Sequence, residues 1–247
     1  MKKRLAIILT SLVALSFVAC STESHNEATT QNNIQHTDSV QNSTDSATNS
    51  LNENTTSAPA TEKKELTIED VNNHSVTSES DIECRTSSDG YSLLSRYNGT
   101  DEIFIMPDTF DSLPIVAVNT YALANNNNCA RAIKFGNNVE TICELSCSVN
   151  ETLEIVITGT NTKTIEKGAF QSCSELKEVV LNEGLEKICT LAFSSCSSLT
   201  SITIPDPNTE IEGNAFFWCH KDLTIYGKAG STAEVYATEN NIKFVAQ

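Results

Sequence analysis

The sequence predicts a solenoid in which short parallel β-strands stack in successive coils of the chain. The main observation is a segment that occurs three times: GAFQSCSELKEVVL (168–181), LAFSSCSSLTSITI (191–204) and NAFFWCHKDLTIYG (214–227). Each copy has an Ala-Phe pair followed by a cysteine, and equivalent residues are 23 positions apart. A fixed period of about 20 to 50 residues is typical of repeat architectures, in which stacked neighbours build one continuous core.

Ladders of apolar residues at this spacing, with slips of one residue, are the second observation. One contains Val118, Ile142, Ile165, Ile188 and Ile211. Another contains apolar-x-apolar pairs, as short strands with one buried face require: Ile133/Phe135, Ile155/Ile157, Val179/Leu181 and Ile202/Ile204, with Ile225 beginning a last pair. We therefore expect about five coils over residues 118–226. The Ala-Phe segments should form helical or 3₁₀ turns that point Phe170, Phe193 and Phe216 inward.

Both ends of the array are predicted to be capped, because an open solenoid end exposes unpaired strand edges. In the N-terminal cap (66–117), Asn98-Gly99 separates two apolar segments and predicts a β-hairpin. In the C-terminal cap (227–247), Ser231 and Glu234 have the spacing of a capping box, which predicts a helix of about two turns. The segment IKFV (242–245) is expected to add a final strand.

The N-terminus has the features of an export signal. Residues 1–19 combine the basic MKKR with an apolar stretch too short to span a bilayer comfortably, and FVAC (17–20) ends it. This resembles the bacterial lipoprotein signal, which implies lipidation of Cys20 and a membrane anchor. The alternative is an ordinary secretory peptide with an incidental cysteine. Residues 20–65, rich in Ser, Thr and Asn, are predicted to be a disordered tether.

The formal net charge of the chain is −16, and three of its sixteen basic residues lie in the first four positions. This charge has the wrong sign for binding to phosphate backbones or to an anionic membrane surface. Nucleic acid is therefore excluded as an expected partner.

The repeat resembles the BspA-type (Treponema-type) leucine-rich repeats of bacterial surface proteins. Segments 165–181 and 188–205 carry the pattern almost whole, and the resemblance covers about residues 90–247. One coil departs from it, since Ser146 and Cys147 replace Ala and Phe, and Asn150 replaces the cysteine. The resemblance implies a leucine-rich-repeat solenoid on a secreted or anchored protein that binds other molecules. Some members of the family are adhesins, and the family brings no catalytic residues or cofactor.

Nine cysteines in an exported chain raise the question of disulfides. In-register stacking would place Cys173, Cys196 and Cys219 in a line with steps of about 4.8 Å. Such a line cannot enclose a zinc ion, and its Cβ atoms are slightly too far apart for disulfides. We expect buried free thiols that pack as small apolar groups. The states of five others stay open: Cys84, Cys129, Cys143, Cys147 and Cys189.

The sequence offers little for catalysis or metal binding. Cys219-His220 is the only Cys/His adjacency, but neighbouring residues of an extended segment point to opposite sides, whereas a dyad needs hydrogen-bond reach. The motifs of phosphate-binding loops, serine hydrolases and zinc proteases are absent, and the four histidines are scattered. We therefore expect no catalytic residues, metal or cofactor.

The outward strand residues are the predicted binding strip, since solenoids present extended binding surfaces. The strip contains Lys134, Val156, Val180, Thr203 and Tyr226, flanked by Glu154, Glu178, Ser201 and Thr224. The alternative is an ordinary solvated sheet. The first functional hypothesis is a cell-surface, lipid-anchored protein that binds an extracellular protein or glycan. The second is an envelope module that contacts cell-wall glycan or a partner lipoprotein, and the least favoured is a secreted cysteine hydrolase.

Overall fold

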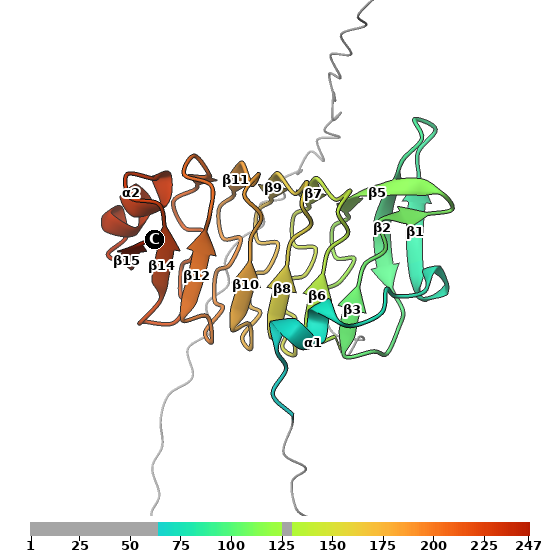
Figure 1. Cartoon of the computed structure of the whole chain (residues 1–247), viewed down its shortest axis with the longest axis horizontal. Helices are drawn as coiled ribbons and strands as arrows, with labels where there is room; N and C mark the ends of the chain where they lie inside the picture. The colour runs from blue at the N-terminus through green and yellow to red at the C-terminus, as the bar shows by residue number, and fades with distance from the viewer. Residues whose placement is uncertain (1–63, 125–129) are drawn as a thin grey trace, which may run out of the picture. The chain divides into compact units, whose positions relative to one another are not determined.

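The computed structural model describes residues 64–124 and 130–247, and it confirms the predicted parallel-strand solenoid (Figure 1). Successive coils each contribute one strand to a sheet that we call sheet I. Its strands lie side by side in the order β3, β6, β8, β10, β12, β14 and β15, all parallel. Their bounds are Ile103–Ile105, Ala132–Lys134, Ile155–Ile157, Glu178–Val180, Ser201–Ile204, Thr224–Gly227 and Lys243–Ala246.

Sheet II forms a second wall of the same coils. It runs in the order β1 (Ile82–Thr86), β2 (Ser92–Tyr97), β5 (Leu113–Val118), β7 (Thr141–Ile142), β9 (Thr164–Ile165), β11 (Lys187–Ile188) and β13 (Glu210–Ile211). A short strand, β4 (Thr109–Phe110), pairs with β5. The predicted ladder from Val118 to Ile211 is in register across β5, β7, β9, β11 and β13. Regular spacing along the chain has thus become regular stacking between strands.

The phenylalanines of the Ala-Phe pairs stack along the core. The ring centroids of Phe170 and Phe193 are 5.2 Å apart, and those of Phe193 and Phe216 are 5.4 Å apart, with nearly parallel planes. Phe135 begins the row and Tyr236 ends it with edge-to-face contacts. All these rings are buried, so the stack links neighbouring coils through dispersion and apolar burial.

The Ala-Phe segments, where helical or 3₁₀ turns were expected, are turns with left-handed residues on either side. The position before the pair, or before the residues that replace the pair, has a positive φ in four coils, at Tyr121, Leu145, Gly168 and Leu191. The second residue after the pair also has a positive φ in four coils, at Val149, Ser172, Ser195 and Trp218. Backbone bonds between coils hold these turns; for example, Phe193 N donates to Ala215 O at 2.9 Å. The coil can therefore turn sharply although left-handed backbone is unfavourable for most residues.

The N-terminal cap contains a hairpin, but not at the predicted place. β1 and β2 pair antiparallel, and the turn between them contains Gly90 at φ 87°. Asn98-Gly99 is not a hairpin turn, because β2 belongs to sheet II and β3 to sheet I. The cap also contains a 3₁₀ helix, η1 (Glu79–Asp81), and a helix that was not predicted, α1 (Ile68–Asn72).

The C-terminal cap contains the expected helix and strand. α2 (Thr232–Glu239) follows Ser231, whose hydroxyl accepts a hydrogen bond from Glu234 N at 3.3 Å. The carboxylate of Glu234 accepts from Gly230 N rather than from Ser231 N, so the capping box is displaced by one residue. β15 then adds to the edge of β14. No helix in the described part of the chain is long and apolar enough to cross a bilayer.

Candidate binding surface

The register of sheet I decides which side chains face outward. The inward row is Phe104, Ile133, Val156, Val179, Ile202, Ile225 and Phe244. Val156 is fully buried in the core, so its predicted place on the binding strip is wrong. Three consecutive apolar residues, Ile155-Val156-Ile157, permit either register, and the pair Ile155/Ile157 faces outward instead.

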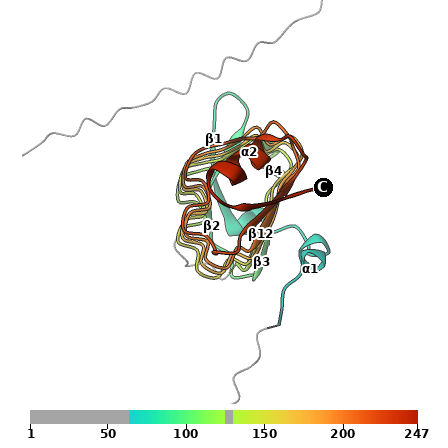
Figure 2. The same cartoon turned by 90° about the vertical axis from the view of Figure 1, so that its left-hand side faces the viewer.

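Helix α1 covers the outward side of the first strands of sheet I. Val71 is fully buried there against a second apolar cluster, separate from the main core, with Leu66 and Ile68 packed at its side. The strand residues of this cluster are Ile103, Ile105, Ala132, Ile155 and Ile157. Figure 2 shows α1 outside the coils, and in Figure 1 it crosses β6 and β8. This half of the sheet face is therefore closed to a partner.

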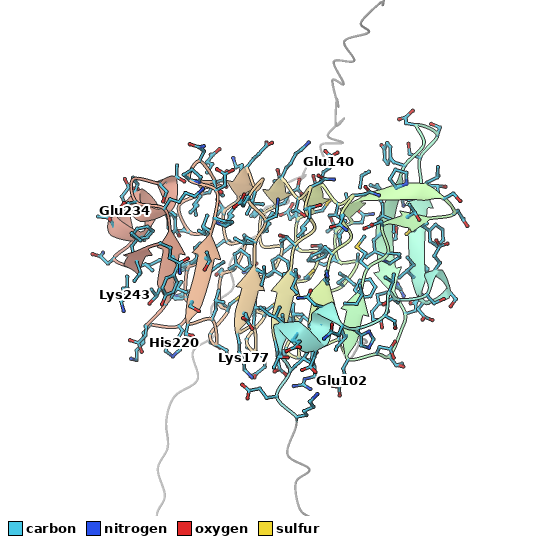
Figure 3. The ribbon with its side chains drawn as sticks, viewed as in Figure 1. Glu102, Glu140, Lys177, His220, Glu234 and Lys243 are labelled. Atoms are coloured by element: carbon cyan, nitrogen blue, oxygen red, sulfur yellow. The ribbon has the colours of Figure 1, made fainter. Side chains whose placement is uncertain are left out.

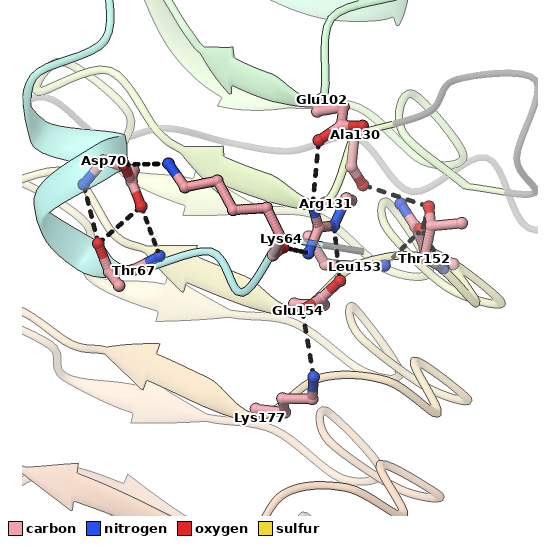
Figure 4. Close-up of polar contacts among 11 residues, drawn as sticks. Lys64, Thr67, Asp70, Glu102, Ala130, Arg131, Thr152, Leu153, Glu154 and Lys177 are labelled. Atoms are coloured by element: carbon pink, nitrogen blue, oxygen red, sulfur yellow. Dashed lines mark hydrogen bonds and ion pairs between the residues drawn. The ribbon is translucent and has the colours of Figure 1, made fainter. Parts of the chain in front are cut away.

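Glu154 is the second predicted strip residue that is wrong, because its side chain is only 6% exposed. Its Oε1 accepts from Arg131 Nε at 2.7 Å, and its Oε2 accepts from Lys177 Nζ at 3.2 Å (Figure 4). Arg131 also donates to Glu102 Oε2 and to the carbonyl of Lys64, the residue that leads into α1. Arg131, Glu154 and Lys177 are 23 residues apart, so the repeat spacing was a signal by which this ion ladder could have been found.

The other predicted residues divide between buried and open positions. Thr224 is buried, and Lys134 is half-buried with its Nζ bonded to Asn72 Oδ1. Beyond α1, the strands β10, β12, β14 and β15 present what we call the open face. It consists of Glu178, Val180, Ser201, Thr203, Tyr226, Lys243 and Val245.

The last two members of the open face, Lys243 and Val245, were not predicted from the sequence. Lys243 pairs with Thr224, and Val245 pairs with Tyr226. Lys243 is labelled in Figure 3. The interval from Tyr226 to Val245 is 19 residues rather than 23. The repeat spacing therefore gave no signal for them, and only the alternation in IKFV placed a strand there.

The cysteines of the described residues are all free thiols, including Cys84, Cys143, Cys147 and Cys189, whose states the sequence left open. The thiols of Cys173, Cys196 and Cys219 donate to carbonyl groups of the preceding coil at 3.2, 3.2 and 3.0 Å. The acceptors are Cys147, Phe170 and Phe193, always 26 residues earlier. Each of these thiols thus satisfies a backbone carbonyl group of the preceding coil by a hydrogen bond. Cys20 and Cys129 lie outside the described residues.

Most of these thiols are unsuited to nucleophilic chemistry. Burial raises the pKa of Cys173 and of Cys143 to about 12, and the pKa of Cys84 to about 11. The neighbouring Cys219 thiol and burial together raise the pKa of Cys196. These groups are therefore protonated at neutral pH, whereas the thiolate is the nucleophile.

Cys219 and His220 are turned to different partners. The neighbouring Cys196 thiol lowers the pKa of Cys219, but the Cys219 thiol donates to Phe193 O. His220 Nδ1 accepts from Asp222 N at 3.1 Å. Within the described ranges, no group of three or more His, Cys, Asp or Glu side chains could hold a metal ion. The described coils thus offer extended surfaces through which the chain can bind other molecules.

Comparisons with known proteins agree with this geometry. Residues 106–222 match the family model of the BspA type leucine rich repeat region in six copies. A T. pallidum leucine rich repeat protein is similar in fold, with 23% sequence identity and a TM-score of 0.55 over 62% of this chain and 71% of that one. A leucine-rich repeat protein from Bacteroides ovatus is 21% identical, with a TM-score of 0.44 over 68% of this chain and 40% of that one. No curated protein matches the sequence at a significant level.

Proposed function

Because residues 106–222 of this chain form a BspA-type leucine-rich repeat region, we propose that the protein binds another protein on its open face. Such repeat regions are in general non-enzymatic modules for protein–protein binding. The partner in this proposal is an extracellular protein.

The row of side chains along the open face is the observation that carries the proposal. Val180, Thr203, Tyr226 and Val245 are register neighbours on β10, β12, β14 and β15. Val180 is 37% exposed, Tyr226 and Val245 are half-buried, and Thr203 is exposed, so three of the four positions hold apolar or aromatic side chains where solvent would favour polar groups. Glu178 and Lys243 flank it. An apolar centre with a charged rim is the usual anatomy of a protein interface.

A lysine at Val180 or Tyr226, within this row, should weaken partner binding while the protein stays folded. We expect Val180→Lys and Tyr226→Lys each to weaken binding at least about tenfold, because a buried lysine at an interface must lose its hydration. The change in melting temperature should be small, since both side chains are partly in solvent. Affinity is measured against partners captured from arrays of extracellular matrix proteins and from envelope fractions.

Val235→Lys is the matched control, because Val235 is 55% exposed on α2, outside the open face. This variant should bind like the unaltered protein. Equal binding by Val180→Lys, Tyr226→Lys and Val235→Lys would reject the open face as the site. Capture of envelope components alone, with no matrix protein retained, would favour the second hypothesis, an envelope module.

We also propose that the protein is exported and held at the membrane by a lipid on Cys20. The support is the basic and apolar leader, FVAC at 17–20, and the polar segment 20–65, all of which lie outside the described residues. Two or more acyl chains would give stable anchoring. A protein produced in a bacterial host should incorporate an alkyne-labelled fatty acid, and Cys20→Ser should remove all of the label. Label that persists in Cys20→Ser would overturn the assignment.

A further inference from the structure

The last repeated coil carries two aromatic side chains in solvent. Phe217 is 47% exposed and Trp218 is 73% exposed. Their ring centroids are 4.5 Å apart and their planes are tilted by 31°, so the two rings stack partly on each other. We call this stacked, solvent-exposed pair the platform. Exposed aromatic groups of this size are uncommon on a soluble surface and mark sites of interaction.

The repeat itself shows that packing does not require these aromatics. The positions equivalent to Phe217 hold Ser148, Gln171 and Ser194, and those equivalent to Trp218 hold Val149, Ser172 and Ser195. The four residues of the Trp218 ladder all have φ between 56° and 62°, in the left-handed region. A small polar residue suits such a turn, whereas a bulky residue there is uncommon and strained.

A pocket lies beside this platform, between the last Ala-Phe turn and the connection from α2 to β15. Its volume is about 240 Å³, and Phe217, Trp218, His220, Asn214, Asn240 and Asn241 contribute to its lining. Pockets for drug-sized ligands are larger, about 300 to 1,000 Å³. This pocket therefore suits a single ring or a similarly small group. His220 is labelled in Figure 3 at this end of the solenoid.

The polar groups around the platform are available to a ligand. Among the described residues, the side-chain amides of Asn214 and Asn241 have no hydrogen-bond partner within the chain. His220 Nδ1 accepts from Asp222 N, so the proton of the neutral ring is on Nε2, which can donate. Lys221, which also lines the pocket, pairs with Asp222 at 2.7 Å. The site thus offers neutral donors and acceptors.

We propose that this platform and pocket bind a neutral pyranose ring of an oligosaccharide. The C–H groups on one face of such a ring are positively polarised and suit the negative face of an aromatic ring. Its hydroxyls both donate and accept, as do the amides of Asn214 and Asn241. The site lies apart from the open face, and the inference does not depend on the function proposed for that face.

Trp218 is the only tryptophan in the sequence, so its fluorescence reports directly on this site. Titration of the full chain with chitotetraose, cellotetraose and maltotetraose should give a saturable change in emission with at least one of them. Calorimetry should show at least tenfold weaker binding to the Trp218→Ser and Phe217→Ser variants. Serine already occupies the equivalent positions 195 and 194, so both variants should keep the melting temperature of the parent protein.

Val149→Ser is the matched control, since Val149 is an exposed apolar residue at the same ladder position of an earlier coil. It should leave oligosaccharide binding unchanged, and so should Val180→Lys. The inference is overturned if none of the three oligosaccharides gives a saturable change, even if an apolar peptide does. It is overturned equally if Trp218→Ser binds the sugar as tightly as Val149→Ser.

Discussion

Replacement of Glu154 by alanine should lower the free energy of unfolding by about 3 to 5 kcal/mol, because it leaves the charge of Arg131 buried without its main partner. Both side chains are 6% exposed, and their shortest contact is 2.7 Å. The hydrogen bond from Arg131 to Glu154 is also the largest cause of the raised pKa of Arg131. The remaining acid, Glu102, is 64% exposed and compensates only in part.

Chemical denaturation followed by circular dichroism measures this loss, with Lys177→Ala as the control. Lys177 contacts the same carboxylate at 3.2 Å but is 55% exposed, so its removal should cost less than about 1 kcal/mol. The double variant Arg131→Met with Glu154→Leu removes both charges and should regain most of the stability. If Glu154→Ala is no more harmful than Lys177→Ala, the pair does not hold the coils together as described.

Phe193→Ala should cost about 3 to 5 kcal/mol, the range for an aromatic side chain deleted from a packed core. Phe193 is fully buried between Phe170 and Phe216, at centroid distances of 5.2 and 5.4 Å. Its removal breaks contacts with both neighbouring coils, and solenoid stability depends on such nearest-neighbour interfaces. The same denaturation assay gives the value.

The control for the aromatic stack is Phe217→Ala in the next coil. Phe217 follows the stacked Phe216 in sequence but is 47% exposed, so its removal should change stability by no more than about 0.5 kcal/mol. Similar losses for the two variants would show that the stack contributes no more than a surface contact. This comparison separates loss of core packing from loss of an aromatic residue in general.

Much of the fold could be predicted because the repeat converts sequence spacing into spatial spacing. Residues 23 positions apart are neighbours in the structure, as in the ladder of Ile142, Ile165, Ile188 and Ile211. The same spacing joins Arg131, Glu154 and Lys177 into an ion ladder. Because the coils stack in register, each residue of one coil contacts the equivalent residue of the next coil.

The binding strip was predicted less well, because alternation and spacing disagreed in one coil. The apolar-x-apolar alternation favoured Ile155 and Ile157 as inward residues. The 23-residue repeat favoured Val156 instead, because Val156 lies 23 residues after Ile133 and 23 residues before Val179. The structure follows the interval. A strand of three apolar residues can face either way by itself, and its neighbours in the sheet decide the register.

The sequence by itself determined the period, the parallel stacking and the rows of phenylalanine and free cysteine, because these follow from contacts between equivalent residues. Cys173 and Cys196 are buried as expected, whereas Cys219, in the last repeated coil, is only partly buried. Only the tertiary structure decided which part of the outer sheet face is free. Helix α1 lies outside the repeat, and its contacts join residues such as Asn72 and Lys134, which are 62 positions apart. Contacts at such separations have no period in the sequence. They are made because α1 buries Val71 against Ile155 and Ile157, which the coils alone leave in solvent.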